Sequence, residues 1–350
     1  MLFYLRIAAA LLPAAVQGSS LEPALPAETG ARLRAAIERA VEHNPEIGAM
    51  EARISAARHR VPQATALPDP EIEIGLKDVP VSNPSLTRDS MTMEMIMARQ
   101  RLPGAGKLGV EERAARADSE GMEADHARHV AEVAADVADS FFRLAALDRK
   151  IAIARETLQR LADAAAAARE RYRVGKAAQA DVLRAHLDRT ALEDRLSSLA
   201  GERRSEAARF NSLQDLPAAS EVPAVDVGGD LESGIAAGPV PEAADLIRLA
   251  ERDSPAVAVA AAGVRREEAR VEGARLERRP DWMLQTYYGR RESFEDMAGV
   301  SVSFTLPWVH PRRLDEKKAE REAALSGAKA TLAAVRNGLR RDIEQAWSDL

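Results

Sequence analysis

The chain has 350 residues, 46% of them hydrophobic and only 4% aromatic, so it is long enough for two domains and is not disordered throughout. Its 49 lysines and arginines against 55 aspartates and glutamates give a net charge of −6, which is not the charge signature of a nucleic-acid-binding protein. The sequence contains no cysteine, which excludes disulfides, thiolate metal sites, a cysteine nucleophile and a lipid anchor on an N-terminal cysteine.

Residues 1–20 have the pattern of an export signal peptide. Arg6 provides a weakly positive start, Ile7 to Val16 form an apolar stretch, and Val16-Gln17-Gly18 is a small-residue cleavage site. The alternative interpretation is a short hydrophobic first helix. No later run reaches the roughly 18 apolar residues that a membrane-spanning helix needs. The sequence therefore predicts an exported chain without a helical membrane anchor.

Residues 30–213 form a first predicted unit, in which two short helices precede two strands. Asn44-Pro45 separates the two short helical patterns. The runs at about 71–78 and 91–101 alternate between apolar and polar residues, as strands with one apolar face do. The apolar face of the first strand carries Ile72, Ile74 and Leu76, and we expect Glu71, Glu73 and Glu94 on the polar face.

Two groups of potential metal ligands are present. Met91, Met93, Met95 and Met97 have thioethers that suit Cu(I), but strict alternation favours an apolar strand face. His126 and His129 share a helix face without a clear set of carboxylates around them, which favours a solvated face. No Walker A, Rossmann, nucleophile-elbow or zinc motif occurs. We therefore predict no metal ligands, no cofactor and no enzymatic activity.

A long helical hairpin follows the strands. Residues 107–173 lack proline and repeat apolar residues every seventh position, which indicates a coiled-coil helix of about 100 Å at 1.5 Å per residue. The pattern breaks at the turn Arg173, Val174, Gly175 and Lys176, and a return helix is predicted at 178–212. Asp181 lies just after the turn, where an aspartate commonly caps a helix start.

The second half repeats the first. A linker is predicted at 214–241 and a second unit at 242–350, with strands at about 281–290 and 299–306 and a long helix from 311. Pro255 and Pro280 follow Pro45 and Pro70 at the same offset, which indicates tandem copies of one unit. Val300, Val302 and Phe304 share one strand face. The last helix still continues at residue 350, so we expect a C-terminally truncated second repeat.

Four strands with one apolar face leave two architectures open. One is a membrane β-barrel closed by several copies, because open sheet edges are not tolerated in lipid. The other is a small soluble sheet that caps a helical bundle. Trp282, Tyr287 and Tyr288 are similar to an interfacial aromatic belt.

The ordered set of motifs resembles the TolC-like outer-membrane efflux proteins over residues 30–350. The segments that carry the resemblance are HNPEI from His43, DSPAV from Asp253 and RYRVGKAAQADVLRAHLDRTALEDRL from Arg171. RLPGAGKLGV from Arg101 resembles the strand-to-helix junction of the heavy-metal branch of that family.

The resemblance implies a mainly α fold with a small membrane β part. Three copies would form a homotrimer with a twelve-stranded barrel in the outer membrane of a Gram-negative cell and an α-helical tunnel reaching into the periplasm. Glu71, Glu73, Glu94 and Asp181 would face the lumen, and Ile72, Ile74, Leu76, Val300, Val302 and Phe304 would face lipid. A chain without its second hairpin supplies only part of the tunnel wall, so we expect it to assemble less readily.

The implied function is the exit duct of a tripartite efflux system. An inner-membrane pump and a periplasmic adaptor, which would contact Arg173, Val174, Gly175 and Lys176, would deliver metal cations or small toxic compounds for passive export. The alternatives are the exit duct of type I protein secretion and a soluble periplasmic coiled-coil adaptor.

Overall fold

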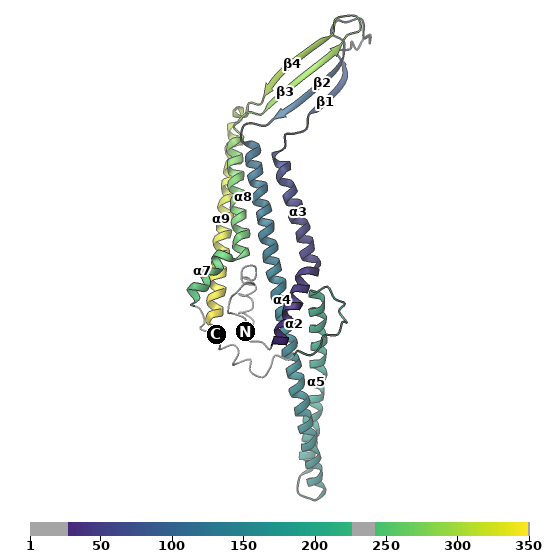
Figure 1. Cartoon of the computed structure of the whole chain (residues 1–350), viewed down its shortest axis with the longest axis vertical. Helices are drawn as coiled ribbons and strands as arrows, with labels where there is room; N and C mark the ends of the chain where they lie inside the picture. Colours follow the sequence, from purple (N-terminus) through teal and green to yellow (C-terminus); the bar gives the residue numbers. More distant parts are fainter. Residues whose placement is uncertain (1–26, 226–241, 349–350) are drawn as a thin grey trace. The chain divides into compact units, whose positions relative to one another are not determined.

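The computed structural model describes residues 27–225 and 242–348 (Figure 1). The predicted export signal and the predicted linker from residue 226 to 241 lie outside the described residues. The described part is mainly helical with one small sheet, as predicted. No helix within 27–225 or 242–348 is long and apolar enough to cross a membrane.

Helices alternate with two β-hairpins along the chain. The first half contains α2 (Ala27–His43), α3 (Pro45–Thr65), β1 (Glu71–Lys77), β2 (Met93–Leu102), α4 (Lys107–Arg173) and α5 (Gln179–Leu213). The second half contains α7 (Ala243–Asp253), α8 (Pro255–Leu276), β3 (Trp282–Arg290), β4 (Met297–Phe304), the 3-10 turn η1 (Pro307–Val309) and α9 (Pro311–Ser348).

The chain divides into two compact units, and each contains segments of both sequence halves. Among the described residues, the first unit comprises 27–51, 125–225, 242–255 and 339–348. The second comprises 52–124 and 256–338 and includes the whole sheet. The compact units therefore do not coincide with the two halves of the sequence.

The break between α2 and α3 follows from local chemistry. The Asn44 side-chain oxygen accepts a hydrogen bond from the backbone N–H of Glu46 at 2.8 Å, as an N-cap residue does. Pro45 occupies the first helical position, where its missing N–H costs nothing. The Asn44 amide also donates to the backbone oxygen of Leu213 at 3.4 Å, which ties the cap to the end of α5.

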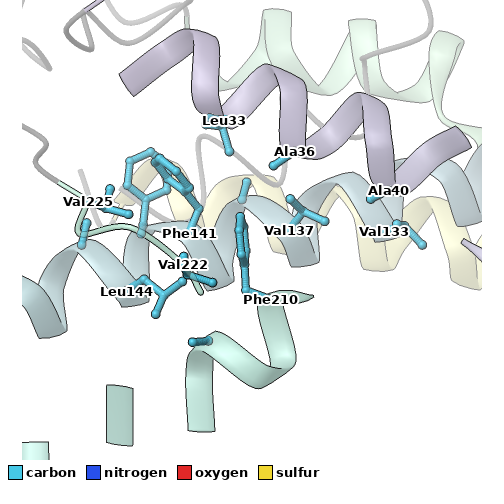
Figure 2. Packing of buried hydrophobic residues seen from close by; sticks show 14 of the residues in the cluster. Leu33, Ala36, Ala40, Val133, Val137, Phe141, Leu144, Phe210, Val222 and Val225 are labelled. Atoms are coloured by element: carbon cyan, nitrogen blue, oxygen red, sulfur yellow. The ribbon is translucent and has the colours of Figure 1, made fainter. Parts of the chain in front are cut away.

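The core of the first unit lies where α2, α4 and α5 meet (Figure 2). Phe141 on α4 is buried, and its ring lies 5.8 Å from that of Phe142 and 6.1 Å from that of Phe210. These are three of only six phenylalanines in the chain, so this aromatic-poor protein concentrates large side chains at one crossing.

The first part of the predicted linker belongs to this core. Val222 and Val225 are buried against the cluster (Figure 2). Arg203 on α5 binds Asp148 on α4 at 2.5 Å and donates to the backbone oxygen of Val222 at 2.9 Å. Asp148 also accepts the backbone N–H of Val225 at 3.0 Å. Residues up to 225 are therefore packed and hydrogen-bonded.

The second unit holds one antiparallel sheet in the order β1-β2-β3-β4, visible in Figure 1. The first hairpin pairs β1 with β2 and the second pairs β3 with β4. The central ladder joins β2 to β3, so it connects the two sequence halves. Within the described residues, β1 and β4 are edge strands.

We predict that Phe141→Ala destabilises the first unit by about 3–5 kcal/mol, because it removes a buried ring and leaves a cavity among three helices. Denaturant unfolding followed by far-UV circular dichroism measures the change. The control is Ile153→Ala on the same helix, which truncates a half-exposed side chain and should cost within about 0.5 kcal/mol. Equal effects of the two substitutions would contradict this account of the core.

Candidate functional site

The register of the strands assigns every sheet side chain to one of two faces, because directly opposed residues in an antiparallel pair share a face. Ile74 opposes Ile96, which opposes Tyr288. One face, the apolar face, carries the exposed side chains Ile72, Ile74, Leu76, Ile96, Leu102, Trp282, Leu284, Tyr288, Val300, Val302 and Phe304. It extends over all four strands and is covered by no other described segment.

The opposite face, the methionine face, is polar apart from its thioethers and one tyrosine. It carries Glu71, Glu73, Lys77, Met93, Met95, Met97, Arg99, Arg101, Met283, Gln285, Tyr287, Met297, Ser301 and Ser303, with glycines at 75, 289 and 299. Glu73 forms an ion pair with Arg99 at 2.6 Å. The Tyr287 ring lies over Gly299, where an added Cβ would come within 2.4 Å of it.

Two expectations about these faces are corrected. Glu94 opposes Leu76, so it lies on the apolar face and not beside Glu71 and Glu73. It pairs there with Arg290 at 3.5 Å. Met93, Met95 and Met97 lie on the face of Glu71 and Glu73, not on the apolar face.

Both errors arise because the pairing register between neighbouring strands cannot be read from the sequence of one strand. Alternation within one strand separates its two faces, but it does not say which face of the next strand continues each of them. A shift of one residue exchanges the two. The polar loop between residues 77 and 93 is too long to fix the register through a two-residue turn.

A junction immediately before β3 ties the two sequence halves together. The Asp281 carboxylate accepts hydrogen bonds from the Gly104 backbone N–H at 2.8 Å and from the Lys107 amine at 2.7 Å. Its backbone exchanges two hydrogen bonds with Thr305, each at 3.0 Å. A Cβ on Gly104 would approach the Pro280 oxygen to 2.7 Å, so the close contact needs glycine.

This contact was not foreseen from the sequence. The sequence feature that could have indicated the contact is an acidic residue at the same position of both repeats, Asp281 in the second and Glu71 in the first. Burial raises the pKa of Asp281, but the hydrogen bonds from Lys107 and Gly104 and the charges of Lys107 and Arg101 outweigh it. The pKa of Asp281 therefore lies below its usual value.

The turn at Arg173, Val174, Gly175 and Lys176 joins α4 to α5. Gly175 has a φ of 72°, which residues with a Cβ rarely adopt, and the Lys176 N–H donates to the Arg171 oxygen at 2.8 Å. The Arg173 side chain binds Glu170 at 2.9 Å. Tyr172, Val174, Leu183 and Leu187 are exposed on and beside the turn.

Asp181 has a local partner at this turn. Its carboxylate accepts the backbone N–H of Ala178 at 3.2 Å, next to the first residue of α5. The structure thus gives Asp181 the helix-capping contact.

The two histidines on α4 are not simply solvated, which corrects the sequence interpretation. Both side chains are about a quarter exposed or less; His129 lies 3.2 Å from Glu46 and 3.7 Å from Glu132, and His126 lies 4.0 Å from Glu51. In the part of the chain that the structure describes, no group of three or more histidines and carboxylates is placed to hold a metal ion.

The comparisons with known proteins agree with this architecture. A family model described as outer membrane efflux protein matches residues 36–216, more than half of the chain. The chain belongs to this family. It is 25% identical over 293 residues to the cobalt-zinc-cadmium resistance protein CzcC of Cupriavidus metallidurans. That alignment covers 83% of the chain and 66% of CzcC, so the chain spans just under two thirds of this relative.

Solved structures share the fold. The outer membrane protein VceC of Vibrio cholerae superposes with a TM-score of 0.70 at 17% identity, over 88% of this chain and 76% of VceC. The CmeC outer membrane channel of Campylobacter jejuni gives 0.67 at 12% identity, over 97% of this chain and 77% of CmeC. Identities this low establish the fold alone.

We predict that Asp281→Asn reduces stability at neutral pH by roughly 1–2 kcal/mol, because it weakens charge-assisted hydrogen bonds that are partly screened by solvent. The folded-state pKa of Asp281 is depressed, so its contribution is present above the unfolded value near 3.9 and is lost as pH falls through the folded pKa. Thermal melting of both proteins from pH 7 to below 4 measures this.

The stability difference between wild type and Asp281→Asn should therefore shrink as the pH falls below about 4. Asp315→Asn is the control, since this carboxylate pairs with Arg278 on the surface and is 60% exposed. A difference between wild type and Asp281→Asn that persists unchanged in acid would exclude the proposed electrostatic role of the junction.

Proposed function

We propose that this protein is the outer-membrane exit duct of a tripartite efflux system. The observation that carries the proposal is the sheet, which combines two edge strands, unpaired among the described residues, with an exposed apolar face. Membership of the outer membrane efflux protein family supports it.

Water is an unfavourable surrounding both for the open strand edges and for the exposed apolar face. Edge strands present unpaired N–H and C=O groups that invite pairing with another chain, and large exposed apolar patches mark interaction or membrane surfaces. In a lipid bilayer the apolar face is satisfied, but the open edges are not, because lipid offers no hydrogen bonds. Pairing β4 of one copy with β1 of the next satisfies both requirements. Three copies of four strands would close a homotrimeric barrel of twelve strands.

In this arrangement the apolar face contacts outer-membrane lipid through residues such as Ile74 and Val300. The methionine face lines the lumen, with Glu71 and Glu73 as its acidic groups. Glu94 would face outward, which a barrel tolerates only near the membrane surface. It is the second residue of β2 and pairs with Arg290, the last residue of β3, so its position at the end of the strands fits this requirement.

The helices would form the periplasmic tunnel, and the turn at residues 173–176 would dock on the adaptor. Val174 at the turn and Leu187 beside it are 58% and 70% exposed, and no described residue covers them. Apolar side chains at the end of a helical hairpin suit packing against a helical partner. An inner-membrane pump would supply the energy, because the duct itself is passive.

The proposed cargo is metal cations or small toxic compounds. The similarity to CzcC supports the metal cations. The acidic groups of the methionine face fit a lumen that admits cations.

Disulfide trapping tests barrel closure. The chain has no native cysteine, so Ile74→Cys on β1 combined with Val300→Cys or Val302→Cys on β4 gives the only thiols. We expect oxidation in membranes to link copies into covalent dimers and trimers but nothing larger, and the covalent link also retains weakly associated copies. Non-reducing electrophoresis measures the products.

The control for trapping pairs Ile74→Cys with Leu284→Cys on β3, an interior strand that no second copy can reach. This pair should give monomer. If the edge-strand pairs also give only monomer, or give an unlimited series of oligomers, a closed trimer is excluded.

Planar-bilayer recording tests the duct. We expect trimers of the chain, retained by the disulfide where few copies assemble, to form ion-conducting pores, because an open lumen lined by charged side chains conducts small ions. The pores should be selective for cations over anions. A Glu71→Gln/Glu73→Gln variant should lose that selectivity, since both carboxylates are assigned to the lumen. Glu316→Gln on α9, in which an exposed carboxylate is neutralised outside the sheet, is the control. Absence of any conductance would refute the duct.

A further inference from the structure

Methionine is segregated to one side of the sheet. The aliphatic side chains of the apolar face are isoleucine, leucine, valine and alanine, without a methionine. On the methionine face the reverse holds: apart from one tyrosine, every apolar side chain is a methionine. Five of the nine methionines of the chain lie there. Hydrophobic filling alone does not require this separation, because branched side chains bury as much apolar surface and specify packing better.

The register gathers three of these methionines around one glycine, with a fourth beside them on β2. Met95 on β2 opposes Gly289 on β3, and Gly289 opposes Met297 on β4, so these residues form one row across three strands. The Met93 sulfur lies over Gly289, within 2.4 Å of where a Cβ would stand. Met97 lies one alternation along β2 from Met95. The missing side chain at Gly289 therefore leaves the space that the Met93 sulfur occupies.

The gathered thioethers are buried and have mixed surroundings. Met93, Met95 and Met97 are 3%, 8% and 8% exposed and pack with Met297 and Tyr287. The Gln285 amide donates to the Met97 sulfur at 2.7 Å, so this sulfur already accepts a polar partner. Glu73 opposes Met97 and Lys77 opposes Met93 on β1. One carboxylate and one amine thus border the cluster.

We propose that Met93, Met95, Met97 and Met297 form a binding site for a soft monovalent cation, Cu(I) or Ag(I). Thioethers are soft ligands that suit such ions, whereas Zn(II) is bound by thiolate, imidazole and carboxylate ligands. The long unbranched side chains can turn their sulfur atoms toward one ion with little backbone change. Because the chain has no cysteine, no thiolate competes for it.

The role of the site rests on the proposed function. In a barrel the methionine face lines the lumen, and the cluster would be a transient binding site for a soft cation during export. Met283 lies on the same face, toward the opposite end of β3 from Gly289, and would extend the path along the sheet. The substrate class of the duct would then include soft monovalent metal ions.

Silver titration tests the site. The purified full chain in detergent is titrated with silver nitrate in buffer free of chloride and thiols, and isothermal calorimetry measures affinity and stoichiometry. Met93→Leu/Met95→Leu/Met97→Leu keeps side-chain volume nearly constant, so folding should persist by circular dichroism. We expect the triple variant to bind silver at least about tenfold more weakly, a loss that even a supporting group causes at metal sites.

The matched control removes three other methionines, in Met50→Leu/Met91→Leu/Met122→Leu, and should bind silver like the wild type. Gly289→Ala leaves every thioether in place but puts a methyl group where the Met93 sulfur lies, and should weaken binding. Zinc nitrate should not compete with silver. Equal silver affinity in wild type and the cluster variant, or zinc affinity equal to that for silver, overturns the site.

Bilayer recording separates this inference from the duct. If silver binding depends on the cluster but the chain conducts no ions, the site is sustained and the duct is refuted. Conductance in a chain whose cluster variant binds silver like the wild type would sustain the duct and refute the site.

Discussion

The antiparallel register between β1, β2 and β3 is the constraint on which the chemistry of this protein depends. It places Ile74, Ile96 and Tyr288 in one row on the apolar face. It also places Met95 beside Gly289 in a row on the other face. A shift of one residue between β1 and β2 would put Glu71 and Glu73 beside the exposed apolar side chains of β2, and a shift between β2 and β3 would separate Met95 from Gly289. The backbone hydrogen bonds of these two ladders thus decide which side chains share the apolar face and which share the methionine face.

The junction at Asp281 maintains that register where the strands meet the helices. Strand pairing alone leaves the ends free to slip, whereas the Asp281 contacts to Gly104, Lys107 and Thr305 fix β3 against both β4 and the start of α4. The helices contribute through close approach: an added Cβ on Gly273 of α8 would come within 3.2 Å of Val110 on α4. A glycine at this crossing lets α8 and α4 pack closely without a large aromatic side chain between them.

The periodicity of apolar residues was sufficient to predict the main helices and strands. The alternation at residues 71–76 and the proline-free heptads from residue 107 to 173 predict elements that the structure contains as β1 and α4. The turn at Gly175 was readable because a glycine interrupts a sustained helical pattern. The positions of Glu94 and the methionines were not readable, because they depend on pairing between strands rather than on any one strand. The Asp281 contact was missed because it joins residues 174 and more positions apart.

The central ladder between β2 and β3 has a consequence for the order in which the chain folds. Gln285 and its partner Met97 are 188 residues apart, so α4, α5, α7 and α8 are all synthesised between β2 and β3. Such long-range pairing is slow, and the free edge of β2 invites aggregation in the meantime. Glu94, Arg99 and Arg101 place charges along β2 and act as gatekeepers during that interval. Charges that disfavour wrong pairing therefore lie in a strand whose second partner is made much later.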